Sequence, residues 1–316
     1  LLLARVATLL VTLSAYPLVG QIHYVAMAGQ TPDEPYTNGW NSAASNIQAA
    51  VAVATPGSTI VISNGVYAIT STITNNGLVI RSLEGHPTNT TIDAGGVCRV
   101  FHVQSGTLLG LTITNGYDLG QGGGILFDGT GPSTARWCVV ARCLATNGGG
   151  IAMLSANTLV DECVMTSNQA LQYGGGVYLD HAGGILRNGV VSHNESGKSG
   201  GGVYLKNGFV TGCTISTNTG NGTTWSGGGG LYVTSATASM CTVVANTTPS
   251  AAYGAGVMVG KNGNLSDCRI INNLGTYAIH ANAINAAIRR CVVSGNSSGQ
   301  GIYLGNTAFA ENTLVH

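Results

Sequence analysis

The stretch Gly174-Gly-Gly-Val-Tyr178 returns 26 residues later as Gly200-Gly-Gly-Val-Tyr204, and this spacing decides the fold. The same glycine-rich motif recurs along most of the chain. Its copies start at Gly122, Gly148, Gly174, Gly200, Gly228 and Gly254. A repeat of about 20 to 50 residues is typical of a solenoid, in which each unit packs only on its neighbours.

A second motif lies between the glycine copies. It is a short strand that ends in asparagine, as in Cys213-Thr-Ile-Ser-Thr-Asn218. Six copies run from Cys163, Gly189, Cys213, Cys241, Cys268 and Cys291 (the Cys slot) to Asn168, Asn194, Asn218, Asn246, Asn273 and Asn296 (the Asn slot). Cys138 to Cys143 fits the pattern, and we expect Gly110 to Asn115 to extend it backward. β-branched strands separated by tight turns, without an amphipathic helix, predict one coil of a parallel β-helix per unit.

Two apolar rows of this repeat predict the core. They lie two residues after and three residues before the Cys slot. The rows are Met165, Val191, Ile215, Val243, Ile270, Val293 and Val160, Leu186, Val210, Ala238, Leu265, Ile288. The Asn-slot residues are expected to form a ladder at an inner turn, because asparagine tolerates left-handed backbone and its side-chain amide both donates and accepts.

The chain has eight cysteines, and an even number in an exported protein is compatible with disulfides. Six of them, Cys138, Cys163, Cys213, Cys241, Cys268 and Cys291, repeat in the Cys slot, which favours a column of reduced, buried thiols. Disulfides are the alternative. No cysteine or histidine pair has zinc-binding spacing, so we expect neither a metal nor a cofactor.

The ends of the chain differ from the repeat. Residues 1–20 are typical of a secretory signal peptide, with one arginine before a short apolar run. In the segment 21–57, residues 41–54 predict a helix that Asn41 or Ser42 would cap. Residues 58–316 predict a β-helix of about eight or nine coils. No C-terminal cap follows, so we expect the protein to continue, and no transmembrane segment follows the signal peptide.

The repeats resemble those of chlamydial polymorphic outer-membrane proteins, in which a strand ending in Asn alternates with a Gly-Gly-Ala-Ile/Leu/Val motif. Cysteine replaces the phenylalanine that this family favours. The run from Asn46 to Tyr67 is similar to the start of secreted right-handed β-helix proteins, including pectin-active enzymes. These resemblances imply an all-β protein, a single-stranded right-handed parallel β-helix (solenoid) with a short N-terminal capping α-helix. They also imply a surface-exposed, adhesin-like protein.

Charge limits the function. The 316 residues include 12 Lys and Arg and 12 Asp and Glu, so the formal net charge is zero. A nucleic-acid binder needs a concentrated positive field, so this class is excluded. We expect a secreted or cell-surface (outer-membrane-associated) protein that acts in adhesion or recognition by multivalent contact along one face. Its partner would be a polysaccharide or a surface protein of a host or neighbouring cell. The alternative is a polysaccharide lyase or glycoside hydrolase.

Two outward columns are candidate sites. Tyr178, Tyr204 and Tyr232 follow the glycine motif on consecutive coils and form an aromatic strip, which either binds sugars or a partner protein, or packs as a cross-strand ladder. Arg136, Asp161 and Arg187 would also be neighbours. They could serve a lyase, but the alternative of a surface ion-pair ladder is favoured, because a carboxylate between two arginines is already neutralised.

Overall fold

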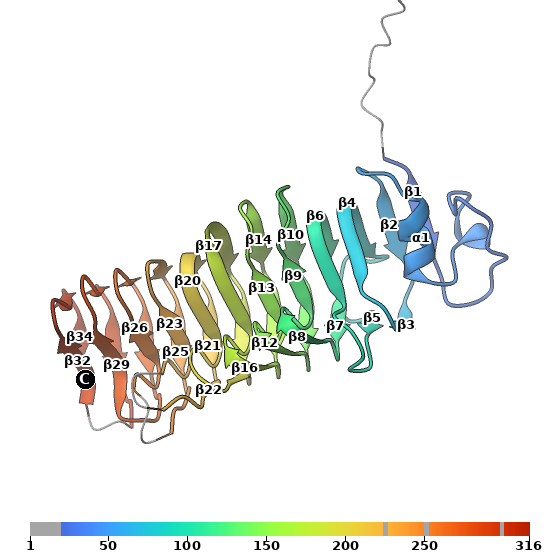
Figure 1. Cartoon of the computed structure of the whole chain (residues 1–316). Coiled ribbons are helices and arrows are strands. Elements are labelled where there is room, and N and C mark those ends of the chain that lie inside the picture. Colours follow the sequence, from blue (N-terminus) through green and yellow to red (C-terminus); the bar gives the residue numbers. More distant parts are fainter. Residues whose placement is uncertain (1–19, 224–226, 250–252, 298–299) are drawn as a thin grey trace, which may run out of the picture.

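The protein is an elongated right-handed parallel β-helix (Figure 1). This computed structural model describes residues 20–316 apart from 224–226, 250–252 and 298–299. The predicted signal peptide therefore lies outside the described residues, except for Gly20. All pairs between the named strands are parallel, which confirms the predicted fold class. No helix in the described ranges is long and apolar enough to span a membrane.

Three sheets form the walls of the rod. In the described residues, sheet A has 18 strands, sheet B has 11 and sheet C has five. Sheet A consists of β1(Ile22–Val25), β2(Thr59–Ile62), β4(Ile73–Ser82), β6(Phe101–Leu109), β9(Ile125–Phe127), β10(Ser133–Arg136), β13(Ile151–Met153), β14(Thr158–Asp161), β17(Val177–Arg187), β20(Val203–Thr211), β23(Leu231–Val233), β24(Thr237–Ser239), β26(Val257–Val259), β27(Asn264–Ser266), β29(Tyr277–Asn282), β30(Ala287–Arg289), β32(Gln300–Gly305) and β33(Phe309–Glu311).

The strands of sheet B lie in the second motif, and those of sheet C lie in the segment directly after it. Sheet B consists of β3(Gly65–Ala68), β5(Thr90–Asp93), β7(Thr112–Thr114), β11(Val139–Ala141), β15(Val164–Thr166), β18(Val190–Ser192), β21(Thr214–Ser216), β25(Thr242–Val244), β28(Arg269–Ile271), β31(Val292–Ser294) and β34(Leu314–Val315). Sheet C consists of β8(Tyr117–Gln121), β12(Leu144–Asn147), β16(Gln169–Tyr173), β19(Glu195–Ser196) and β22(Thr219–Gly220). The strands β3 and β5 belong to coils that precede the first glycine triplet.

Left-handed residues turn the chain at three corners of each regular coil. One is the first glycine of the triplet, such as Gly200 with φ 64°. The other two come directly before the Cys and Asn slots, such as Glu162 with φ 52° and Thr217 with φ 52°. The left-handed conformation was predicted for the Asn-slot residue itself, and this is wrong by one position. The ladder asparagine is therefore free to use its side chain for bonding between coils.

The Asn-slot residues form a continuous hydrogen-bonded column. The Nδ2 atoms of Asn168, Asn194, Asn218, Asn246 and Asn273 each donate to Oδ1 of the asparagine one coil further, at 2.9–3.0 Å. The backbone N–H of each donates to the same Oδ1, and Nδ2 also donates to a backbone carbonyl, as from Asn218 to Val191. Asn218 is fully buried, and its amide donors and acceptor are all paired.

The column ends in a thiol. Cys143 takes the Asn slot as predicted, and its Sγ accepts from the backbone N–H of Gly116 at 3.3 Å. The predicted register of the preceding copy is wrong by one residue: Thr112 pairs with Val139, so Leu111 takes the Cys slot and Gly116 the Asn slot. Asn115 lies instead at the left-handed corner, with φ 53°, a conformation that asparagine tolerates.

The core contains the predicted apolar rows. Every member of both rows is at most 1% exposed, and so are the six cysteines of the Cys slot. All eight cysteines are free, and Cys98 is the one that is not fully buried. Burial raises the pKa of the Cys143 thiol to about 12, so this thiol stays protonated at neutral pH.

The N-terminal helix is shorter than predicted. A 3-10 turn spans Trp40–Ser42, and α1 spans Ile47–Val53, not 41–54. The cap is Asn46, whose side chain accepts from the Ala49 N–H at 2.8 Å. Ala43 is extended, with ψ 146°, which separates the two turns. The helix packs against β1, β2 and β4 at one end of the rod (Figure 1).

Candidate functional site

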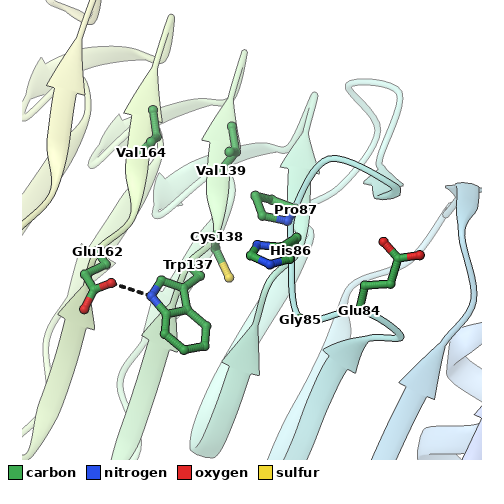
Figure 2. A pocket seen from close by; sticks show the side chains of 9 residues that line it. All are labelled: Glu84, Gly85, His86, Pro87, Trp137, Cys138, Val139, Glu162 and Val164. Atoms are coloured by element: carbon green, nitrogen blue, oxygen red, sulfur yellow. Dashed lines mark hydrogen bonds between the residues drawn. The ribbon is translucent and has the colours of Figure 1, made fainter.

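A pocket of about 390 Å³ opens at the corner where sheet A passes into sheet B. We call it the Trp137 pocket. Figure 2 shows Glu84 to Pro87, from the loop between β4 and β5, on one side of it and Trp137 on the other. Its lining residues are Glu84, Gly85, His86, Pro87, Trp137, Cys138, Val139, Glu162 and Val164. Loop residues and corner residues from three coils thus form one hollow.

The loop wall is fixed by the coil beneath it. Gly110 has φ 61°, and a Cβ atom there would lie 2.2 Å from the Gly85 carbonyl oxygen. The loop can therefore rest on this corner only because the residue is glycine. Thr112 Oγ1 donates to the Pro87 carbonyl at 2.7 Å, and Arg81 Nη1 donates to the Leu83 carbonyl at 3.0 Å. These contacts hold the loop at a fixed distance from Trp137.

Trp137 is an exposed aromatic side chain in a restrained position. It occupies the left-handed corner before the Cys slot, with φ 52°, and is 39% exposed. Its Nε1–H donates to Glu162 Oε2 at 2.5 Å, and the Arg136 guanidinium lies 4.5 Å from the ring centroid. Trp137 lines the pocket and Arg136 does not, so the exposed part of the indole can be reached from the hollow. The residue at this corner is left-handed in the other regular coils as well, but only the coil of Trp137 has a tryptophan there.

A buried carboxylate supports this arrangement. Asp161 has 1% of its side chain exposed and contacts Arg187 at 3.0 Å and Arg136 at 3.5 Å. Asn188 Nδ2 also donates to it, at 3.1 Å. Arg136, Asp161 and Arg187 are thus neighbours, as predicted. Asp161, which lies between the two arginines, is buried and not at the surface. With its oxygens occupied, Asp161 positions Arg136 behind the indole and is not available as a catalytic base.

Asp161 makes the stability depend on pH. The hydrogen bond from Arg187 is the largest cause that lowers the pKa of this carboxyl. A lowered folded-state pKa adds stability above the unfolded value, near 3.9, and this stability is lost as the pH falls through the folded-state pKa. We expect Asp161→Asn to lose less stability than the wild type between about pH 5 and about pH 3, measured by urea unfolding. Equal losses would contradict this assignment, and Asp33→Asn is the control, because Asp33 is exposed and has no ion pair in the described residues.

The tyrosine column is stacked along the rod. The ring centroids of Tyr178 and Tyr204 lie 5.5 Å apart, and those of Tyr204 and Tyr232 lie 4.7 Å apart with an interplanar angle of 3°. Tyr173 also contacts Tyr204, at 4.7 Å. A sugar that stacks on an aromatic residue needs a free ring face. The two neighbours of Tyr204 cover its faces, so the geometry favours ladder packing, and binding at this column stays a prediction.

Sequence reasoning missed the Trp137 pocket. A signal was present, because Trp137 lies directly before a Cys-slot residue, at a corner where other coils have Glu162, Asn188 or Asp267. The wall from Glu84 to Pro87 had no comparable signal, because it lies before the regular repeats begin. In the described part of the chain, no group of three or more His, Cys, Asp or Glu residues is arranged to hold a metal ion.

Comparisons with known proteins agree with this fold. Residues 173–316 match the family described as "Right handed beta helix region". The structure is similar to that of pectate lyase Pel9A, with a TM-score of 0.60 and 15% identity over 93% of this chain and 79% of the lyase. It is also similar to the Dettilon tailspike protein, with a TM-score of 0.51 and 14% identity over 84% of this chain and 54% of the tailspike. No curated protein matches the sequence.

These identities show a shared fold and no more. The chain is therefore a right-handed β-helix protein. The resemblance to chlamydial polymorphic outer-membrane proteins stays a prediction.

Proposed function

We propose that this protein is a secreted or cell-surface recognition protein that binds a polysaccharide, with the Trp137 pocket as its principal contact. Export rests on the signal-peptide pattern of residues 1–20. A polysaccharide is favoured over a surface protein because the site is a hollow of about 390 Å³ and not a broad apolar patch. The rod and its repeated outer faces would supply the further contacts of a multivalent adhesion protein.

The position of the indole carries this proposal. Glu162 and Arg136 hold the Trp137 ring, and the exposed indole lines the hollow. The apolar C–H face of a sugar ring can pack on such an aromatic face, while carboxylates on the rim accept hydrogen bonds from sugar hydroxyls. Because the ring is already held, little side-chain entropy is lost when the sugar binds.

An enzymatic function is the second candidate, because Glu84 and Glu162 line the same pocket. A glycoside hydrolase needs one carboxyl group that stays protonated to act as general acid. Here, hydrogen bonds from Asn64 and Asn89 lower the pKa of Glu84. Those from Arg136 and Trp137 lower the pKa of Glu162. Both groups are therefore ionised at neutral pH, which favours binding over acid catalysis.

Trp137→Ala tests the proposal. We expect affinity for a bound polysaccharide to fall at least about tenfold, because a central tryptophan is among the side chains that contribute most to binding. Calorimetric titration of the full chain with a panel of oligosaccharides would measure this loss. Trp40→Ala is the matched control, since Trp40 is similarly exposed, at 36%, but lies in the N-terminal segment.

The same panel separates the two functions. Equal binding by the wild type and Trp137→Ala, or no binding by either, would refute the proposed site. Release of unsaturated products or new reducing ends, abolished by Glu162→Gln, would instead establish an enzyme.

A further inference from the structure

We propose that His280 is a pH-sensitive switch in the coils far from α1: its neutral imidazole packs between two tyrosine rings, and its protonation opens the contacts of β29 with β26 and β32. These three strands are neighbours in sheet A, at the end of the rod opposite α1 (Figure 1). The inference does not involve the Trp137 pocket, so it goes beyond the proposed function and can be tested without it.

Aromatic rings enclose the imidazole of His280. Its ring centroid lies 4.6 Å from that of Tyr253, at an interplanar angle of 15°, and 4.9 Å from that of Tyr303, at an angle of 5°. Tyr253 precedes β26 and Tyr303 lies on β32, so the two tyrosines come from the coils on either side of β29. Tyr277 also contacts the ring, at 5.4 Å. His280 is only 2% exposed, so the stack joins three coils and keeps almost all water from the imidazole.

One ring nitrogen of His280 has nothing to bond to. Its Nδ1 is buried and has no hydrogen-bond partner in the described part of the chain. In the neutral imidazole this nitrogen can be the unprotonated one, which leaves only an unpaired acceptor. Protonation would convert it into a charged N–H donor that still has no acceptor. A buried charge costs far more than a buried neutral group unless it is paired, so the stack accommodates the neutral ring and not the cation.

No charged group in the strands around His280 compensates this cost. The three tyrosines are the titratable side chains whose rings contact it, and a tyrosine hydroxyl is uncharged in neutral and acidic solution. β26, β29 and β32 contain no charged residue, and β26 places Met258 opposite His280. On β28, which also packs against β29, the charged residue is Arg269, which is exposed on sheet B. Although tyrosine faces attract cations, burial lowers the pKa of His280 to about 4.

The direction of the pH effect follows from this burial. Above about pH 6.5, the ordinary pKa of histidine, the ring is neutral whether the coils are closed or open, and the stack is fully stable. As the pH falls from there to about 4, the ring of the open state takes up a proton and the enclosed ring does not, which favours opening. At pH 5 the equilibrium should therefore shift toward the open coils at least about tenfold relative to pH 7.

Hydrogen exchange of the full chain at pH 7 and pH 5 tests the inference. After correction for intrinsic exchange rates, we expect the protection of amides in β29 and β32 to fall at least about tenfold in the wild type. His280→Tyr and His280→Phe keep an aromatic ring but have no group that titrates in this range, so the fall should be absent. His193→Asn is the control, because His193 is exposed at a corner where another coil has Asn272, and it should behave as the wild type does.

The wild type alone can overturn the inference. Equal protection of β29 and β32 at pH 7 and pH 5 would do so whether or not the variants fold. A fall in protection that persists in both His280 variants would assign the effect to other groups and would also overturn it. A fall confined to the wild type and His193→Asn would support it. Polysaccharide binding through Trp137 is measured separately, so none of these results decides the proposed function.

Discussion

Replacement of Asn218 by alanine is expected to lower the free energy of unfolding by about 4 kcal/mol. The Asn218 side chain accepts from the backbone N–H and from Nδ2 of Asn194, at 2.9 and 3.0 Å. Its Nδ2 donates to the Val191 carbonyl and to Asn246 Oδ1, both at 2.9 Å. The variant loses all four bonds and removes the acceptor of two Asn194 donors in the interior. Each buried unpaired group costs about 1–3 kcal/mol.

Urea unfolding followed by far-ultraviolet circular dichroism would measure this loss. Asn221→Ala is the control, because Asn221 lies three residues away but is exposed and bonds to Glu195 on the surface. We expect the control to change the unfolding free energy by less than about 0.5 kcal/mol. A similar effect of the two substitutions would show that the ladder contributes nothing particular to stability.

Gly201→Ala is expected to destabilise the fold by about 3 kcal/mol or more, although it adds one methyl group. A Cβ atom at Gly201 would lie 2.3 Å from the Gly229 carbonyl oxygen and 2.4 Å from the Thr219 carbonyl carbon. Both contacts are to backbone of the fold, so no side chain can rotate away. The two coils would have to separate at this corner, which breaks the hydrogen bond between the Gly201 N–H and the Gly228 carbonyl at 3.0 Å.

Gly183→Ala is the matched control for this prediction. A Cβ atom there would be no closer than 3.3 Å to its neighbours, and the residue is exposed with no positive φ. The melting temperature of the control should stay near that of the wild type. If Gly201→Ala melts at the same temperature as Gly183→Ala, then the second glycine of the triplet is not needed for close approach of the coils.

The repeat allowed the fold to be predicted because its period and its slots describe one coil completely. The apolar rows, the Cys slot and the Asn slot all lie where the spacing placed them. Two positions were misjudged for local reasons. Asn115 was assigned to the ladder because it ends a similar strand, whereas the register with Val139 places it one residue earlier, at a corner. The helix begins at Ile47 because Asn46 caps it.

The candidate site was less predictable, because it joins a repeat position to a part of the chain outside the repeat. Trp137 belongs to a corner column that the period defines. The opposite wall of the pocket, Glu84 to Pro87, belongs to a loop whose path depends on the missing side chain of Gly110, which lies on the coil between them. Neither spacing nor composition indicates that this loop turns back over the corner. The pocket between Trp137 and this loop is thus a property of the tertiary structure.

The direction of the asparagine ladder has an evolutionary consequence. Each of the five ladder amides from Asn168 to Asn273 donates to the asparagine of the following coil, and Asn194, for example, accepts from Asn168 and donates to Asn218. Each coil therefore meets its neighbours through the same pair of surfaces. Deletion of one whole unit, such as residues 148–173, would join Asn147 to Gly174 and still place Cys143 opposite Asn194. Genes for such rods can gain or lose units by unequal crossing-over, and the length of the protein can change without redesign of its interior.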